Sequence, residues 1–189
     1  MSARRLFLTG PSGCGKSTLL RNALQGKTAR AGGFVTDRAV DEIGRYQYFY
    51  LRRADGSGDP AIFLDLRQHP PAKHNDVFTD LAAMILREQA PFFLLDEIGG
   101  MELLLPEFRA ALDDFLVSDI PCIGVLKGVK NSRALSETAG LPEPFLQIAK
   151  ALRQQLEEDV NTQILKMSGW SDPAAMDAVT AWVEEYAHG

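Results

Sequence analysis

The chain has 189 residues, of which 46% are hydrophobic and 24% are charged, as in ordinary soluble proteins with one domain. Its net charge of −5 argues against nucleic acid as the main partner, and no apolar run is long enough to span a membrane. Two cysteines, Cys14 and Cys122, are too few for a disulfide framework. We therefore expect a cytoplasmic protein without a secretory signal, with residues 1–189 forming a single domain.

An apolar strand at about residues 4–9 leads into a glycine-rich segment and then into a helix that ends near residue 25. The segment matches the phosphate-binding pattern G-x-x-x-x-G-K-[ST], and it consists of Gly10, Pro11, Ser12, Gly13, Cys14, Gly15, Lys16 and Ser17, followed by Thr18. Glycines let backbone N–H groups turn toward an anion, and the helix start adds the positive end of its dipole. We predict that this segment binds a nucleoside triphosphate, with Lys16 on the β- and γ-phosphates and Ser17 on Mg²⁺.

The next part of the chain has the pattern of an antiparallel hairpin. Two glycines open a strand at residues 34–36, and a turn at 41–44 leads into residues 46–51, where aromatic side chains alternate. A short strand at 62–64, a loop at 67–76 and a helix at 77–88 follow. We therefore expect a hairpin inserted near residues 33–53.

A buried strand at residues 92–96 ends in an acid, Asp96, and a second acid, Glu97, comes directly after it. In a parallel sheet the carboxyl end of such a strand lies beside the phosphate loop, so Asp96 is predicted to hold Mg²⁺ together with Ser17. Glu97 follows at once and can accept a proton from an attacking water. Lys16, Asp96 and Glu97 are accordingly the predicted catalytic residues.

Strand and helix alternate in the rest of the chain, which predicts an α/β fold with a mostly parallel sheet flanked by helices. The expected elements are a helix at 106–117, a strand at 121–126, a loop at 128–143, a helix at 143–159, a strand at 164–167, and a helix that begins at Pro173 with Asp172 as its N-cap.

Two further features of this half are candidates for substrate contact. Lys127, Lys130 and Arg133 follow the 121–126 strand, where a lid formed by residues 128–160 could bring positive charge to the γ-phosphate. Trp170 follows the last strand. It can stack on a nucleotide base, or it can pack against the final helix near Trp182.

Two motifs beyond the phosphate loop resemble a known family. Asp96-Glu97-Ile98-Gly99 with Met101-Glu102-Leu103, and Gly33-Phe34-Val35-Thr36-Asp37 upstream, are similar to signatures of the small P-loop nucleoside-triphosphatases that include the cancer-related nucleoside triphosphatase. The resemblance covers residues 5–127. It implies a P-loop NTPase fold and Mg²⁺-dependent hydrolysis of ATP, GTP and other nucleoside triphosphates to diphosphate and phosphate. It also places Thr36 and Asp37 near the γ-phosphate or the metal.

The chain departs from this family's pattern at three places. Position 100, where a lysine is usual, is Gly100, so the charge of that lysine must come from elsewhere or be absent. Residues 128–160 form a longer and more helical segment than the resemblance predicts. Residues 168–171 replace an asparagine-arginine turn, so base recognition does not carry over.

Two other functions fit the same motifs. A nucleotide or small-molecule kinase shares the phosphate loop and a basic lid, but the sequence points to no acceptor pocket, and Glu97 beside Asp96 favours activation of water. A nucleotide-dependent switch or adaptor would expose apolar side chains such as Phe145 and Leu146. The sequence leaves the base preference and the oligomeric state open.

Overall fold

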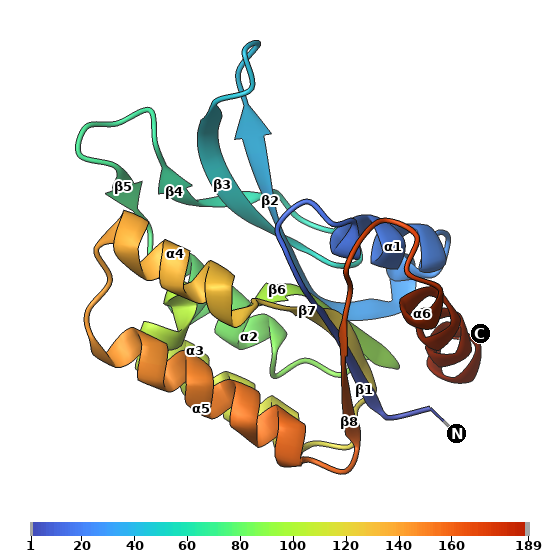
Figure 1. Ribbon diagram of the computed structural model, residues 1–189. Coiled ribbons are helices and arrows are strands. Elements are labelled where there is room, and N and C mark those ends of the chain that lie inside the picture. The colour runs from blue at the N-terminus through green and yellow to red at the C-terminus, as the bar shows by residue number, and fades with distance from the viewer. Residues whose placement is uncertain (1, 188–189) are drawn as a thin grey trace.

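A computed structural model describes residues 2–187, apart from the side chains at positions 138 and 139, and shows one eight-stranded sheet between two layers of helices (Figure 1). The strands are β1 (Arg5–Thr9), β2 (Ala31–Val40), β3 (Tyr46–Arg53), β4 (Ala61–Asp65), β5 (Ala72–Lys73), β6 (Phe92–Ile98), β7 (Cys122–Leu126) and β8 (Thr162–Lys166). The helices are α1 (Lys16–Ala23), α2 (Ala83–Ile85), α3 (Pro106–Val117), α4 (Val129–Ala139), α5 (Pro144–Glu158) and α6 (Pro173–Tyr186), with the shorter turns η1 (Thr28–Arg30), η2 (Val77–Ala82) and η3 (Met101–Leu104).

The strand order is β5-β4-β3-β2-β6-β7-β1-β8. β2, β6, β7, β1 and β8 pair in parallel, whereas β3, β4 and β5 add to the sheet in antiparallel fashion. The central strands are apolar on both faces because helices cover both sides. The carboxyl ends of the parallel strands therefore meet at one edge, where ligands bind in open α/β sheets.

Each face of the sheet has its own core. Figure 1 shows α1 and α6 together on one face and α2 to α5 on the other. Under α1 and α6, the largest buried side chain is Trp182, whose ring packs edge-on against Phe92. Under α3 and α5, the core contains Phe34, Phe93 and Phe108, none of which is exposed. Within residues 2–187, no helix is both long and apolar enough to cross a bilayer.

The α/β fold with a mostly parallel sheet and an inserted hairpin is confirmed. The hairpin of β2 and β3 projects beyond the body of the protein in Figure 1. The last helix begins as expected: Asp172 accepts a hydrogen bond from the backbone N–H of Ala175 at 3.3 Å, and Pro173 is the first helical residue. β6 extends past the predicted strand end at Asp96 to Ile98, so Glu97 lies within the strand as well.

The prediction of a loop at residues 128–143 was wrong, because residues 129–139 form α4. This helix ends at Gly140, whose φ of 57° is in the left-handed region typical of helix C-termini. Among its described side chains only Ser132 is buried. With so few buried positions, α4 lacks the apolar stripe by which sequence analysis recognises a helix. The predicted helix at 77–88 is also shorter than expected, because it begins as the π-helical turn η2 and α2 ends at Ile85.

Gly33 allows β2 to pass close to β6. Its φ is 91°, and a Cβ at this position would lie 2.2 Å from the carbonyl oxygen of Leu94, its partner in the register. No other residue avoids both the strained backbone and the clash. The close approach carries Thr36, three residues further along β2, to the end of β6.

We expect Gly33→Ala to lower the free energy of unfolding by at least about 3 kcal/mol, because strain and a backbone clash add together. Gly44→Ala is the matched comparison. Gly44 has a φ of 82° in the hairpin turn, but nothing lies within 4 Å of its Cβ position. Its substitution is expected to cost only about 1 kcal/mol, from strain alone. Urea unfolding of both variants measures the difference, and equal losses would contradict the close approach.

Candidate functional site

A cavity of about 520 Å³ opens at the carboxyl edge of the parallel strands. It brings together the predicted site residues Lys16, Ser17, Thr36, Asp37, Asp96, Glu97 and Lys127. From the phosphate loop and the first turn of α1, the cavity is also lined by Ser12, Gly13, Gly15 and Thr18. These residues come from β2, β6, the segment directly after β7, the β1–α1 connection and the first turn of α1, so the parallel topology assembles the site.

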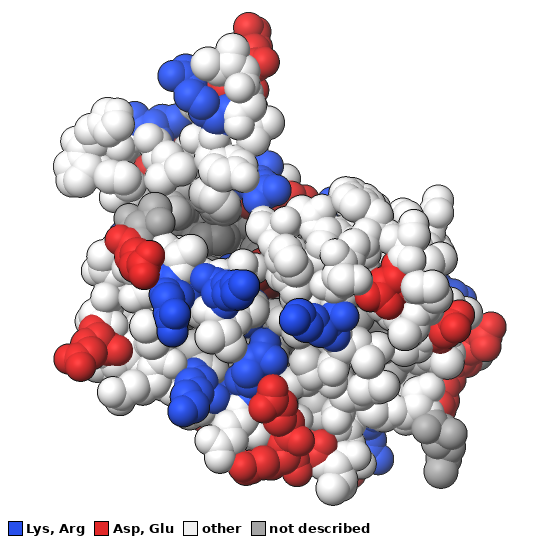
Figure 2. Space-filling model, viewed as in Figure 1, with Lys and Arg blue, Asp and Glu red and all other residues white. Residues whose placement is uncertain are grey.

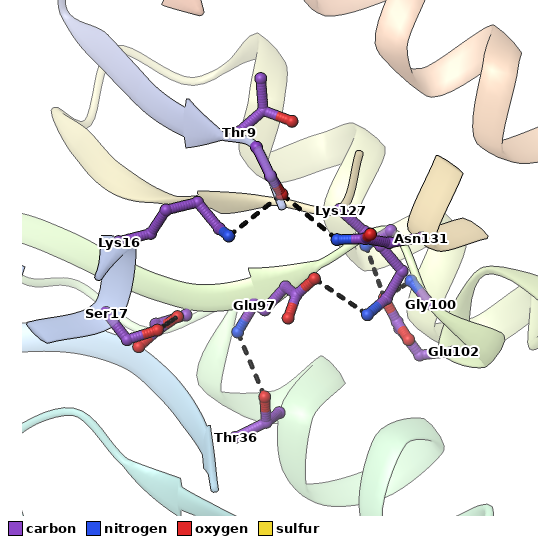
Figure 3. A network of polar contacts seen from close by, with 12 residues as sticks. Thr9, Lys16, Ser17, Thr36, Glu97, Gly100, Glu102, Lys127 and Asn131 are labelled. Carbon is purple, nitrogen blue, oxygen red and sulfur yellow. Dashed lines mark hydrogen bonds and ion pairs between the residues drawn. The ribbon is translucent and has the colours of Figure 1, made fainter. Parts of the chain in front are cut away.

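The side chain of Lys16 extends toward the end of β1 near Thr9 (Figure 3). The Lys16 ammonium donates to the carbonyl oxygens of Gly10 at 3.1 Å and Pro11 at 2.7 Å, and the side chain is almost fully buried. Gly15, with a φ of 93°, turns the chain into α1. Gly10 packs so tightly on the end of β8 that a Cβ there would lie 2.4 Å from the carbonyl oxygen of Met167. The ammonium therefore sits at the beginning of the loop.

Cys14 is the one loop side chain that turns into the core. Its thiol is buried and belongs to the apolar cluster under α1 and α6. Its Sγ lies 4.0 Å from the carbonyl oxygen of Met167. The side chain therefore supports the loop from behind, and it does not line the cavity.

Ser17 and Asp96 meet in the cavity. The Ser17 hydroxyl donates to Asp96 Oδ1 at 2.8 Å, and Asp96 is only 2% exposed. Burial raises the pKa of the Asp96 carboxyl to about 6, the hydrogen bond from Ser17 opposes this shift, and the neighbouring charge of Glu97 adds to it. A buried carboxylate is costly in free energy unless a positive charge compensates it, so this position favours the binding of a cation.

This pair has the donor set that suits Mg²⁺. Magnesium takes hard oxygen ligands, with one or two from the protein and the rest from phosphates and water. Among the described residues, no group of three or more His, Cys, Asp and Glu side chains could hold a metal unaided. Ser17 and Asp96 would therefore hold the ion together with nucleotide phosphates. The oxygen ligands of Ser17 and Asp96 therefore fit a Mg²⁺ ion.

Glu97 is held from two sides, as Figure 3 shows. Its carboxylate Oε1 lies 2.9 Å from the Lys127 ammonium, and its backbone N–H donates to Thr36 Oγ1 at 3.2 Å. Both charged side chains are partly exposed to the cavity, at 30% for Glu97 and 21% for Lys127. The Glu97 carboxylate thus faces the space beside Lys16 and Ser17, and the Lys127 ammonium lies next to it.

The turn after β6 depends on Glu102, to which sequence analysis assigned no role. Glu102 Oε1 accepts the backbone N–H groups of Gly99 at 2.8 Å and Gly100 at 2.7 Å. Burial raises the pKa of this carboxyl, whereas the Gly100 N–H and the charge of Lys127 lower it. The signal was present in the motif Met101-Glu102-Leu103, where an acid interrupts an apolar run.

Position 100 has little room for a side chain. A Cβ on Gly100 would lie 2.6 Å from Glu102 Oε2 and 3.5 Å from Lys127 Cε. The stem of Lys127 thus approaches the site from β7 at the position where the resemblance led us to expect a lysine. The absence of a side chain at Gly100 therefore leaves room for the side chain of Lys127.

The side chain of Asp37 lies on the opposite face of β2 from that of Thr36. Its carboxylate pairs with the guanidinium of Arg21 on α1 at 2.9 Å, and both residues line the cavity. Thr36 and Asp37 are thus both at the site, but Thr36 touches Glu97 and Asp37 touches α1.

The predicted lid residues separate in the structure. Lys127 lines the cavity, Lys130 is exposed and does not line it, and Arg133 lines a second groove of about 470 Å³ between α4 and α5. Figure 2 shows Lys and Arg side chains gathered over these two helices. A lid formed by residues 128–160 stays a prediction.

Two hydrogen bonds connect α4 and α5 to the phosphate loop and the end of β1, and sequence analysis missed both. The side-chain amide of Asn131 donates to the carbonyl oxygen of Gly10 at 3.2 Å. Arg153 on α5 donates to Thr9 Oγ1 at 3.1 Å. Both side chains stand on solvent-facing helices with ordinary composition, so nothing in the sequence distinguishes them.

Trp170 lies over the phosphate loop rather than in the core. Its ring carbon Cε3 is 2.9 Å from the Cβ position of Gly15, and 66% of the residue is exposed. Only a glycine at position 15 leaves room for the indole. Trp182, by contrast, belongs to α6 itself and is fully buried in the core between this helix and the sheet. An exposed aromatic face therefore borders the loop.

A glycine-rich loop between a parallel strand and a helix, with an acid from a second strand of the same sheet beside its serine, defines a P-loop nucleotide-binding protein. A family model described as NTPase matches residues 5–161, and the chain belongs to this NTPase family.

Similar proteins agree with this assignment. The nucleoside-triphosphatase THEP1 of Thermococcus kodakarensis is 32% identical over 152 residues, which cover 71% of this chain and 83% of the relative. The nucleoside-triphosphatase THEP1 of Methanosarcina acetivorans is 26% identical over 176 residues, covering 87% of this chain and 99% of the relative. The crystal structure of THEP1 from Aquifex aeolicus has the same fold, with a TM-score of 0.62, 17% identity, and coverage of 95% of this chain and 99% of that one.

Proposed function

We propose that this protein hydrolyses nucleoside triphosphates, ATP and GTP among them, to diphosphate and phosphate with the help of Mg²⁺. The observation that carries the proposal is the contact between Ser17 and Asp96 at 2.8 Å, in a cavity that also holds Lys16 and Glu97. The activity for which the related nucleoside-triphosphatases are named supports the same proposal.

Each group has a role that follows from its position. Lys16, at the beginning of the loop, leaves the carbonyl oxygens of Gly10 and Pro11 to contact the β- and γ-phosphates. Mg²⁺, bound at Ser17 and Asp96, supplies charge neutralisation on the phosphate oxygens. Glu97 orients a water molecule and accepts its proton as the water attacks the γ-phosphorus. Thr36 fixes the backbone of Glu97 and so keeps the carboxylate in place.

The proposal is tested by measuring phosphate release with ATP, GTP, CTP and UTP, with Mg²⁺ and with EDTA. We expect release from every triphosphate in the presence of Mg²⁺, because the site described above contacts phosphates rather than a base. Chelation should abolish it. A pure, folded protein that releases no phosphate from any of the four would overturn the proposal.

Lys127 takes the role of the lysine that position 100 lacks. Its ammonium lies beside Glu97, and its stem fills the space next to Gly100. A positive charge here can stabilise the γ-phosphate oxygens as the bond to the diphosphate breaks.

We expect Lys127→Met to lower turnover at least about tenfold, because it removes a charge from the transition state. Lys130→Met serves as the comparison, since Lys130 is exposed and outside the cavity. It should change turnover by less than about twofold. Steady-state phosphate release measures both. Equal losses would mean that the lid closes and that Lys130 also reaches the phosphates.

Trp170 is proposed to stack on the nucleotide base, since its exposed ring borders the loop at Gly15. Trp170→Ala is expected to raise the Kd of ATP about fivefold or more, which is the usual contribution of one stacked base. Binding of tripolyphosphate, which has no base, should not change. Isothermal titration calorimetry with both ligands measures this, and equal weakening would show that Trp170 supports the loop instead.

A further inference from the structure

The cavity continues past the catalytic residues onto the opposite face of the sheet. At one end lies Trp170, over the phosphate loop. The other end is walled by apolar side chains from five separate elements, which we call the aromatic wall: Phe49, Phe63, Leu64, Phe78, Met101 and Leu135. Phe63 and Phe78 belong to the core under α3 and α5, whereas Cys14 of the loop belongs to the core under α1 and α6. The cavity therefore crosses the edge of the sheet.

The aromatic wall is a preformed surface. The rings of Phe49 and Phe63 have centroids 6.2 Å apart, and those of Phe63 and Phe78 are 4.9 Å apart. Phe78 in turn packs edge-on against Phe108 in the core, at 5.8 Å. Phe49 and Phe63 are only half-buried, so their remaining faces are available in the cavity.

Glu97 stands between the phosphate loop and the aromatic wall. Phe49 is the register partner of Arg38 on β2, and Thr36, two residues earlier on the same face, accepts the backbone N–H of Glu97 at 3.2 Å. On the other side, Asp96 next to Glu97 contacts Ser17 of the loop. One carboxylate thus adjoins both the triphosphate site and the apolar end of the cavity.

A nucleotide bound at the phosphate loop does not fill the end of the cavity that the aromatic wall forms. Lys16, which meets the β- and γ-phosphates, sits at the beginning of the loop, while Gly15 and the first turn of α1 meet the phosphates nearer the base. Trp170 covers Gly15, so the base leaves the loop on the side away from the aromatic wall. Water as a nucleophile gains nothing from half-exposed aromatic rings, whereas an organic ligand gains about 25 cal/mol for each Å² of apolar surface buried there. A mainly apolar wall with a few polar groups is typical of small-molecule sites.

We propose that the aromatic wall binds a second substrate, an aromatic alcohol, and that the enzyme transfers the γ-phosphoryl group to its hydroxyl. The proposal rests on the hydrolytic function above and adds an acceptor to it. The alcohol oxygen forms a bond to the γ-phosphorus, and the bond from that phosphorus to the β,γ-bridging oxygen breaks, with its electron pair leaving on the nucleoside diphosphate. The alcohol proton passes to the Glu97 carboxylate and then to solvent. Hydrolysis is the same reaction with water in place of the alcohol.

The experiment uses benzyl alcohol as the probe, ethanol as the small alcohol without a ring, and ATP labelled at the γ-phosphate. Single-turnover products are separated into phosphate, benzyl phosphate and ethyl phosphate. We expect benzyl phosphate to form at the expense of phosphate, at least about tenfold more than ethyl phosphate at equal alcohol concentration, since that ratio corresponds to burying one small apolar group.

Two variants locate the acceptor. Phe49→Ala removes a ring from the aromatic wall, and we expect the ratio of benzyl phosphate to phosphate to fall about tenfold. Tyr48→Ala removes the neighbouring ring, which lies outside the cavity under the guanidinium of Arg67, and the ratio should stay near the parent's. If Phe49→Ala does not fold, Leu135→Trp, which fills the cavity from α4, should lower the same ratio.

Several outcomes overturn the proposal. Benzyl alcohol that leaves phosphate as the only product, whether or not it slows hydrolysis, shows that the aromatic wall holds no acceptor. Equal transfer to ethanol, or the same ratio in the Phe49 and Tyr48 variants, shows that the acceptor binds elsewhere. In each case the parent protein still hydrolyses ATP, so the proposed hydrolytic function stands. A parent that binds no ATP and releases no phosphate removes both proposals together.

Discussion

Lys16→Ala is expected to slow nucleoside-triphosphate hydrolysis at least about 100-fold, because positioning and charge neutralisation supply nearly all of the catalysis in phosphoryl transfer. Lys16 is the one cation enclosed by the loop, among the residues that the structure describes. Its ammonium contacts only loop groups, the carbonyl oxygens of Gly10 and Pro11 and the thiol of Cys14. No other side chain can take its place.

The same contacts predict that the variant stays folded. The partners of Lys16 are loop atoms rather than core side chains, so we expect the free energy of unfolding to change by less than about 1 kcal/mol. Lys73→Ala, at an exposed position on β5, is the control for removal of a lysine. Phosphate release and urea unfolding are measured for both. Near-parent turnover in Lys16→Ala would remove the nucleotide site from this loop.

Local motifs and sheet topology were enough to predict which residues meet at the centre of the candidate site. The phosphate loop is recognisable because its glycines, lysine and serine are adjacent in sequence. Ser17 and Asp96 are 79 residues apart, yet their contact could be expected, since parallel strands bring their carboxyl ends to one edge. The same rule placed Lys127 at this edge, although as part of a lid rather than as the partner of Glu97.

The remaining features depend on packing that no short pattern encodes. The aromatic residues of β3 predicted a half-buried strand, and the strand exists, but the sequence does not show that one of its rings faces the nucleotide site. That outcome requires β4, η2 and α4 to converge on the same space. From the sequence, Gly100 indicated that the family's lysine charge was lost. The structure shows that Lys127, which is distant in sequence, lies beside Gly100 in space.

Glu97→Gln should lower turnover by about 10²- to 10⁴-fold, the usual contribution of general base catalysis. The substitution keeps the shape of the side chain and removes its basicity. It leaves the backbone N–H that donates to Thr36, and the amide oxygen can still accept from Lys127. Affinity for ATP with Mg²⁺ should stay near that of the parent, because Lys16, Ser17 and Asp96 are unchanged.

Asp96→Asn is the matched comparison, one residue away on the same strand. Its amide oxygen can still accept the Ser17 hydroxyl, so the fold is expected to persist, but the negative charge that we propose holds Mg²⁺ is lost. This variant should therefore need more Mg²⁺ for half-maximal turnover, whereas Glu97→Gln should need the same amount as the parent. Single-turnover phosphate release across a Mg²⁺ titration, with binding followed by a fluorescent nucleotide, separates the two effects. Hydrolysis at the parent rate in Glu97→Gln would show that another group activates the water. A shifted Mg²⁺ requirement in that variant would instead make Glu97 part of the metal site, and the proton would then have to leave by another route.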